Sequence, residues 1–282
     1  AMAGAAGLKP LVAVAQVTST PDKERNAAAC AGLVREAAAR GALLVFLPEG
    51  FDFIGRDTAQ TLSLAEGLHG DLMGRYAQLA RDCGVWLSLG GLHERGQDWE
   101  TTGRIYNCHA LLDPAGHLVA AYRKTHLCDV ELEGRVSMRE SSFTNPGSEL
   151  VPPITTPVGK LGLSICYDLR FPEVSLALRR AGAEILTYPS AFTVLLRARA
   201  IESQCYVVAA AQTGQNHERR TSYGHAMVVD PWGAVVAQCR EGPGLCYAEI
   251  DLEYLHRVRR EIPVLSHRRP DLYGTVGLAP AP

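Results

Sequence analysis

The sequence has little net charge and no long hydrophobic run, and these two absences exclude several classes of partner. Its 28 lysines and arginines nearly balance 30 aspartates and glutamates, for a formal net charge of −2. A chain without a basic stripe is a poor match for nucleic acid. No apolar stretch approaches the roughly 20 residues that a membrane-spanning helix needs. We therefore expect neither nucleic acid nor a membrane as a partner.

The sequence also lacks paired cysteine motifs. Its eight cysteines are scattered, and no two of them have the CxxC spacing of zinc or thioredoxin-type sites. The histidines show no metal-ligand spacing, and the glycines form no nucleotide-binding loop. We expect no metal and no cofactor. Scattered thiols in a chain of 282 residues indicate a reducing compartment, so we expect the cytoplasm and leave a mitochondrial form open.

Apolar segments alternate along the chain in a pattern that predicts its fold. Apolar residues at helical spacing predict helices at residues 26–40, 71–83, 174–180, 195–204 and 252–260. Short apolar runs bounded by turn residues predict strands at residues 11–17, 43–47, 85–91, 106–112, 118–122, 161–165, 185–188, 206–212, 226–229, 235–238 and 247–250. Residues 125–156 are expected to be irregular. Two similar halves of this kind predict an α/β protein, a four-layer α-β-β-α sandwich.

The composition shows no linker, so we expect one domain over residues 1–282. Hydrophobic residues make up 47% of the chain, which suffices for a large core. Residues 1–9 are expected to be partly a cloning remnant or flexible. The proline-bearing residues 265–282 are expected to form an extended C-terminal arm.

Residues 162–173 (GLSICYDLRFPE) stand out because a cysteine follows a strand-like run and precedes a helix. Cys166 is then at a bend, where its sulfur and the backbone N–H of Tyr167 can face the same cleft. An exposed thiol beside N–H donors is what the nucleophile of an acyl transfer needs. A cysteine taken alone is more often a buried core residue. The charged neighbours Asp168 and Arg170 favour the functional interpretation.

Two further polar residues follow strand-like runs in the same way. Glu49 comes after the run at residues 43–47 and a proline, and Lys124 comes after the run at residues 118–122. Each residue taken alone is more often a solvated surface residue. Together with Cys166 they place a carboxylate, an ammonium and a thiol just past the carboxyl ends of three strands, where ligand crevices form in α/β sheets.

This trio suits thiol-dependent amide hydrolysis. A free cysteine has a pKa near ~8.5 and is mostly thiol at neutral pH, so Glu49 can take its proton as general base and return it to a leaving amine. The positive charge of Lys124 favours the thiolate and then the tetrahedral oxyanion. The product is a thioester, which water activated by the same carboxylate hydrolyses. We therefore predict Glu49, Lys124 and Cys166 as the catalytic residues.

These motifs resemble the carbon–nitrogen hydrolase (nitrilase) superfamily. Its Glu-Lys-Cys triad falls on Glu49 in LPE, Lys124 in YRKTHL and Cys166 in ICYDLRFPE. The match runs over nearly the whole chain and implies a sandwich of the nitrilase type. The stretches most similar to the Nit branch of the superfamily are residues 51–54, 91–96, 127–131 and 267–274.

The resemblance also implies a second glutamate that orients Lys124 and contacts the substrate. Glu140 stands at the matching position. From the sequence alone, Glu131 and Glu133 are rivals for this role.

Three more residues take roles that the resemblance implies. The N–H of Tyr167 completes an oxyanion hole, and Phe192 leads into a substrate-binding loop. Arg170 holds a substrate carboxylate through its guanidinium fork. An ion pair of Arg170 with Asp168 or Glu173 is an equal alternative.

The sequence departs from the family pattern after Phe192. The family has a substrate loop with a His-Trp pair before the next helix, whereas here Phe192 and Thr193 run directly into Val194. About one helical turn and its N-cap are missing. We interpret the gap either as a true deletion in the protein or as a mobile loop whose residues were left out of the sequence. We favour the second interpretation, because mobile loops are common beside active sites.

The resemblance implies hydrolysis of the side-chain amide of deaminated glutathione to 2-oxoglutarate and cysteinylglycine, without a cofactor. One alternative is an ω-amidase that acts on 2-oxoglutaramate. An alternative of another class is a non-catalytic interaction protein that keeps the fold, against which the intact trio argues. We thus expect a small-molecule amide with a carboxylate end as substrate, and a homodimer or homotetramer as the assembly.

Overall fold

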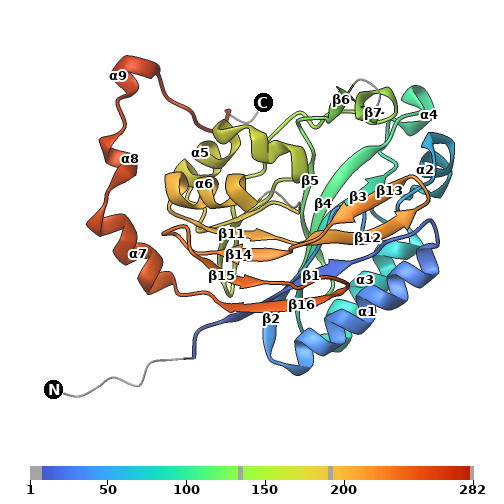
Figure 1. The fold of residues 1–282 in the computed structure, drawn as a ribbon, viewed down its shortest axis with the longest axis horizontal. Helices are drawn as coiled ribbons and strands as arrows, with labels where there is room; N and C mark the ends of the chain where they lie inside the picture. Colours follow the sequence, from blue (N-terminus) through green and yellow to red (C-terminus); the bar gives the residue numbers. More distant parts are fainter. Residues whose placement is uncertain (1–7, 133–135, 190–192, 280–282) are drawn as a thin grey trace.

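Two β-sheets stacked face to face form the centre of the molecule, and helices lie on the outer face of each sheet (Figure 1). This computed structural model describes residues 8–132, 136–189 and 193–279. The layer order α-β-β-α confirms the predicted sandwich. Among the described residues, no helix has both the length and the apolar composition to cross a bilayer.

The first sheet has the strand order β13-β12-β1-β2-β3-β4-β5, and β16 also pairs with β1. Strands β1, β2 and β3 are parallel, and β3, β4 and β5 are antiparallel. The strands are β1 (Leu11–Val17), β2 (Ala42–Leu47), β3 (Trp86–Glu94), β4 (Tyr106–Leu112), β5 (Leu118–Arg123), β12 (Ala211–His217), β13 (Arg220–Tyr223) and β16 (Gly244–Glu249).

The second sheet has the order β15-β14-β11-β10-β9-β8. Its strands are β8 (Ile154–Thr156), β9 (Gly159–Gly162), β10 (Ile185–Thr187), β11 (Tyr206–Ala209), β14 (Met227–Val229) and β15 (Val235–Gln238). A separate hairpin consists of β6 (Asp129–Leu132) and β7 (Val136–Arg139).

The helices form the outer layers and the C-terminal arm. They are α1 (Lys23–Ala39), α2 (Thr58–Leu64), α3 (Asp71–Cys83), α4 (Trp99–Thr102), α5 (Pro172–Arg180), α6 (Thr193–Ser203), α7 (Leu252–Glu261), α8 (Val264–His267) and α9 (Pro270–Tyr273), with the 3-10 helices η1 (Glu140–Ser142) and η2 (Cys166–Arg170). Local sequence explains their ends: Asp22 caps α1 by accepting from the N–H of Arg25, and Gly84 ends α3 in the left-handed conformation with φ 63°.

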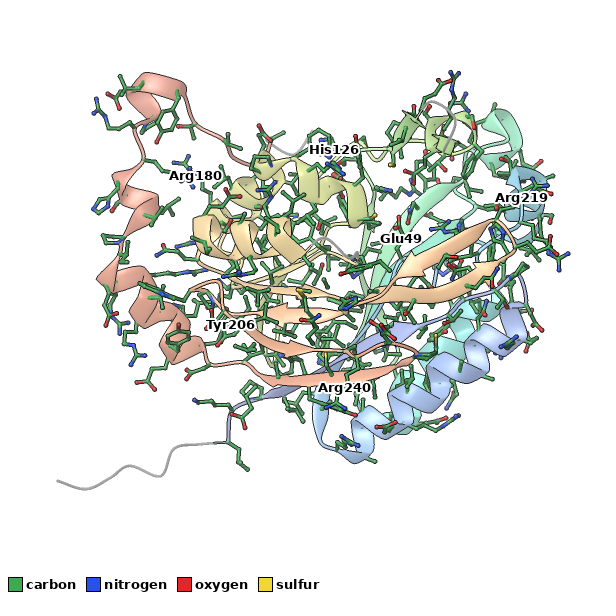
Figure 2. The ribbon with its side chains drawn as sticks, in the orientation of Figure 1. Glu49, His126, Arg180, Tyr206, Arg219 and Arg240 are labelled. Atoms are coloured by element: carbon green, nitrogen blue, oxygen red, sulfur yellow. The ribbon has the colours of Figure 1, made fainter. Side chains whose placement is uncertain are left out.

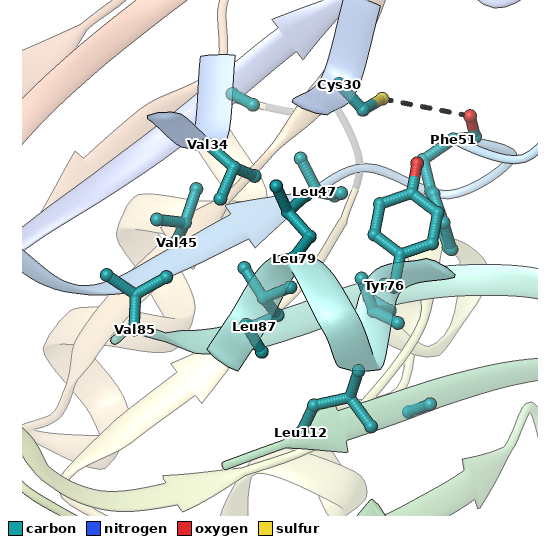
Figure 3. Packing of buried hydrophobic residues seen from close by; sticks show 14 of the residues in the cluster. Cys30, Val34, Val45, Leu47, Phe51, Tyr76, Leu79, Val85, Leu87 and Leu112 are labelled. Atoms are coloured by element: carbon teal, nitrogen blue, oxygen red, sulfur yellow. Dashed lines mark hydrogen bonds between the residues drawn. The ribbon is translucent and has the colours of Figure 1, made fainter. Parts of the chain in front are cut away.

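Alternation of side chains along the strands explains the layers. In β1, Val12 and Val14 belong to the buried cluster between the two sheets, whereas Ala13 and Ala15 belong to the cluster beneath the helices. Successive side chains of a strand point to opposite faces, so a strand that is apolar throughout is buried on both. Figure 3 shows the helix side, where side chains of α1 and α3 pack on β2 and β3.

Several predicted elements differ from the structure. The strand predicted at residues 206–212 is two strands, β11 in the second sheet and β12 in the first, because the chain changes sheets at Ala210. Both strands are buried near the crossover, so hydrophobicity does not mark it. The strand predicted at residues 161–165 ends at Gly162. Residues 125–156 contain β6, β7 and β8, and residues 264–273 carry two single-turn helices.

Candidate active site

Three strand ends bring the predicted catalytic residues together. Glu49 follows β2, Lys124 follows β5, and Cys166 opens η2 after β9. Lys124 Nζ lies 3.2 Å from Glu49 Oε1, and Cys166 is near enough to Glu49 that the charge of the carboxylate raises the pKa of the thiol. Figure 2 shows Glu49 well inside the molecule, near the β12–β13 hairpin, and Gln212 of β12 donates a hydrogen bond to its carbonyl oxygen.

Glu140 holds the ammonium group of Lys124 from a second side. Lys124 Nζ lies 2.8 and 3.1 Å from the two carboxylate oxygens of Glu140, and the N–H of Cys128 donates to the same carboxylate at 2.6 Å. Lys124 is only 2% exposed, so its ammonium group is shielded from water, whereas the side chain of Glu49 is 24% exposed. Of the rival glutamates, Glu131 is exposed and lies 3.3 Å from an arginine of the neighbouring strand, and Glu133 lies outside the described residues.

Asn107 is a site residue that the sequence analysis missed. Its Nδ2 donates to Glu49 Oε1 at 2.7 Å and to Glu140 Oε1 at 3.3 Å, so it joins both carboxylates that surround Lys124. The available signal was an amide near the start of the otherwise apolar run YNCHALL. Gly91 leaves room for this arrangement, because a Cβ there would lie 2.8 Å from Asn107 Oδ1 and 3.1 Å from Glu49 Cγ.

The bend that carries Cys166 is strained. Its φ of 41° lies in the left-handed region that residues other than glycine seldom adopt. Strain of this kind is concentrated at functional sites. The nucleophile of α/β-hydrolases sits on a comparably sharp strand-to-helix turn, which exposes its reactive atom.

Asp168 stabilises the bend that carries Cys166. Its fully buried carboxylate accepts from the N–H of Ile165 at 2.9 Å and from the hydroxyl of Tyr122 at 2.7 Å, and it lies 2.8 Å from Nδ1 of His126. Tyr122 belongs to the first sheet, whereas the bend follows a strand of the second. Asp168 therefore fixes Cys166 relative to the strand end that carries Lys124.

The charges at the site decide where its protons reside. Burial would raise the pKa of Glu49, but Lys124, the Cys166 thiol and Asn107 together lower it below its ordinary value. Burial opposes the ammonium form of Lys124, yet Glu49 and Glu140 raise its pKa well above the ordinary value. Burial and the charge of Glu49 raise the pKa of Cys166, and Lys124 opposes this only in part. The resting groups are a carboxylate, an ammonium and a thiol.

A cavity of about 140 Å³ opens beside these groups. Its lining includes Glu49, Asn107, Lys124 and Glu140 from the first sheet and its loops, together with Arg220 of β13. The cavity thus contains the carboxylate and the ammonium that the predicted reaction needs. Among the described residues, no group of three or more His, Cys, Asp or Glu side chains could hold a metal ion.

Tyr167 and Arg170 are not among the residues that line this cavity. The N–H of Tyr167 is the second of η2, and the first N–H groups of a helix have no partner within it. The guanidinium of Arg170 lies 5.8 Å from the ring centroid of Tyr167, and its charge opposes the rise that burial causes in the pKa of Cys128. Phe192 lies outside the described residues, as does the start of the loop with the gap.

Comparison with known proteins shows the family to which the chain belongs. A model of the family described as carbon-nitrogen hydrolase matches residues 11–260, which include all three strand-end residues. The chain is 67% identical over 277 residues to human deaminated glutathione amidase, with 95% of this chain and 85% of that protein covered.

Solved structures agree as well. The crystal structure of the Caenorhabditis elegans NitFhit protein is 49% identical with a TM-score of 0.89, covering 95% of this chain and 67% of that chain. A variant of the amidase from Nesterenkonia sp. AN1, which shows Michael addition of acrylamide at its active-site cysteine, is 26% identical with a TM-score of 0.74, covering 90% of this chain and 98% of that one.

Proposed function

The chain belongs to the carbon–nitrogen hydrolase family, and from that premise we propose that it hydrolyses the side-chain amide of deaminated glutathione to 2-oxoglutarate and cysteinylglycine. The chain is an amidase of the hydrolase class. Relatives from mouse and human that carry the name deaminated glutathione amidase are 66% and 67% identical to it. The observation that carries the proposal is the meeting of three strand ends, where the carboxylate of Glu49 pairs with buried Lys124 and its charge acts on the thiol of Cys166.

In the first step Cys166 is the nucleophile. Its Sγ forms a bond to the amide carbon while the thiol proton passes to Glu49, and the carbonyl oxygen becomes an oxyanion. Because the pKa of Cys166 is raised, the thiol does not ionise beforehand, and the transfer to Glu49 accompanies the attack. The ammonium of Lys124 and the N–H of Tyr167 stabilise the oxyanion.

In the second step the C–N bond breaks. Glu49 gives its proton to the leaving nitrogen, so that cysteinylglycine departs and a 2-oxoglutaryl thioester remains on Cys166. Glu49 then removes a proton from water, and the water oxygen attacks the thioester carbon. The C–S bond breaks, 2-oxoglutarate leaves, and the sulfur regains its proton from Glu49. Arg170 holds the carboxylate of the 2-oxoglutaryl end.

Intact-mass spectrometry during incubation with deaminated glutathione tests this function. We expect cysteinylglycine release and a transient mass gain equal to a 2-oxoglutaryl group. Cys166→Ala should abolish both, whereas Cys83→Ala, which removes a thiol at the end of α3, should keep both. Turnover of 2-oxoglutaramate alone would identify an ω-amidase. No turnover of either amide would favour a non-catalytic protein.

We further propose that the chain assembles into homodimers or homotetramers. Large apolar side chains are exposed on α6 and the C-terminal arm, among them Ile201 at 51% and Leu272 at 69%. Contact with a second copy would remove them from water. A single species of monomer mass in sedimentation velocity would contradict this assembly.

We propose that the protein resides in a reducing compartment, which is the cytoplasm or, for a mitochondrial form, the mitochondrion. All eight cysteines are free thiols, which suits such a compartment. Recovery of the protein from a secreted fraction would contradict this assignment.

A further inference from the structure

An arginine outside the triad lines the cavity beside Glu49 and Lys124. Arg220, the first residue of β13, shares this cavity with Glu49 and Lys124. The ammonium of Lys124 is held by two carboxylates. By contrast, the guanidinium of Arg220 makes no ion pair within 4 Å to any residue in the part of the chain that the structure describes. Its charge is therefore available to a ligand.

The surroundings of Arg220 are basic. Arg56, Arg219 and Arg220 are all exposed, and their charges act together on the imidazole of His217, whose pKa they and burial lower. Figure 2 shows Arg219 on the same hairpin, on the side of the molecule where Glu49 lies. Exposed arginines of this kind attract an anionic group.

Arg220 lines the same cavity as Glu49, the group that must lie close to the leaving amine. Glu49 returns its proton to the leaving nitrogen, so this nitrogen is within hydrogen-bond reach of Glu49. Arg220 is near enough to Glu49 to contribute to the low pKa of that carboxyl. A cavity of about 140 Å³ is small beside the roughly 300–1,000 Å³ of most ligand sites. The end of a longer leaving group would therefore extend to exposed residues at the rim.

We propose that Arg220 binds the terminal carboxylate of the leaving dipeptide and thereby selects peptide-like amides over small ones. This inference rests on the proposed function and adds a leaving-group contact to it. Cysteinylglycine ends in a carboxylate, which matches the guanidinium fork, whereas the ammonia released from 2-oxoglutaramate has none. A charge-assisted contact of this kind, partly exposed to water, corresponds to about a tenfold effect on kcat/KM.

The test compares two substrates that differ only in this group. One is deaminated glutathione, and the other is its analogue with a carboxamide in place of the terminal glycine carboxylate. We expect the wild-type protein to prefer the carboxylate by about tenfold in kcat/KM. Arg220→Gln should bring that ratio close to one. Arg240→Gln, which changes an exposed arginine that does not line the cavity, should keep the wild-type ratio.

The outcomes separate this inference from the function it rests on. A wild-type protein that does not hydrolyse deaminated glutathione would refute both. A wild-type protein that hydrolyses both substrates equally well would overturn the inference alone, and this result needs no variant. If Arg220→Gln still prefers the carboxylate substrate over its carboxamide analogue, the inference is also overturned. If this preference is lost in Arg220→Gln but kept in Arg240→Gln, the inference is supported.

Discussion

At the residue scale, Glu49 and Cys166 are held in the protonation states that the proposed first step requires. In this step Glu49 must accept a proton. Its lowered pKa keeps it a carboxylate even at pH values below about 4.3, the ordinary pKa of a glutamate. Cys166 must carry the proton that Glu49 takes. Its raised pKa keeps it a thiol even at pH values above about 8.5, the ordinary pKa of a cysteine. These opposite shifts widen the pH range of the active form at both ends.

The resulting prediction concerns the pH profile. We expect kcat/KM to be level across the neutral range, to fall on the acid side only below about pH 4.3 and on the alkaline side only above about pH 8.5. Steady-state kinetics between pH 3.5 and 10, taken as an approximate range, would measure this. A limb near pH 6.5 would instead indicate a histidine as the base.

Lys124→Ala provides the matched variant for the same profile. Removing the ammonium leaves burial to raise the pKa of Glu49, so the acid limb should move to higher pH. The loss of oxyanion stabilisation should also lower kcat by about 10²–10³. An unchanged acid limb would show that Lys124 does not set the protonation of Glu49.

At the scale of elements, β3 controls how closely β2 and β4 bring their polar residues together. Gly91 of β3 accepts a hydrogen bond from the N–H of Gly50 at 2.7 Å, and its missing side chain leaves the space that Glu49 and Asn107 occupy. The packing of three adjacent strands thus positions the general base.

Gly91→Ala is expected to displace Glu49. A Cβ at Gly91 would lie 3.1 Å from the Cα and Cγ of Glu49, which is tighter than most real Cβ contacts, and 2.8 Å from Asn107 Oδ1, which real Cβ atoms essentially never show. A displacement of about 1 Å at a catalytic group costs up to about 10² in rate, so kcat should fall by roughly that factor. Gly32→Ala in α1, where a Cβ meets nothing within 4 Å, should leave kcat unchanged and raise the free energy of unfolding by about 0.5–1 kcal/mol. Equal kcat in both variants would contradict the prediction.

At the scale of the whole molecule, a buried hydrogen bond connects the two sheets at the active site. The hydroxyl of Tyr122 donates to Asp168, and both side chains are fully buried. Another polar contact between the sheets joins Nδ1 of His109 to the carbonyl oxygen of Ser164 at 3.0 Å, whereas the apolar contacts between them are not directional. The hydrogen bond of Tyr122 therefore fixes how the Cys166 bend of one sheet faces the Lys124 strand end of the other.

Tyr122→Phe tests this connection. Loss of a hydrogen bond to a buried carboxylate should lower the free energy of unfolding by about 1.5–3 kcal/mol, and kcat should fall because the bend is no longer fixed. Tyr188→Phe is the matched control, since its buried hydroxyl bonds to the neutral Ser175 instead. Tyr188→Phe should lower the free energy of unfolding by only about 0.5–1.5 kcal/mol and leave kcat unchanged. Denaturant unfolding and kinetics measure both, and equal kcat values would contradict the connection.

Much of the fold and part of the site could be predicted because they depend on local patterns. Apolar runs of strand and helix length determine the layers. The residue that follows each run can be identified from the sequence without knowledge of its neighbours in space. Glu49, Lys124 and Cys166 were found in this way, and family resemblance added Glu140. The crossover at Ala210 was missed, because a buried run looks the same whether it stays in one sheet or changes to another.

The sequence by itself determined the sandwich, the three strand ends and the reactive groups on them, since these depend on side-chain periodicity and chain order. Only the tertiary structure decided which groups touch. The contact of Asn107 with two carboxylates depends on the order β2-β3-β4, and Asp168 reaches Tyr122 only because the sheets stack. The direction of each pKa shift also belongs to the structure, because burial and nearby charges act through distance in space, and no spacing along the chain encodes that distance.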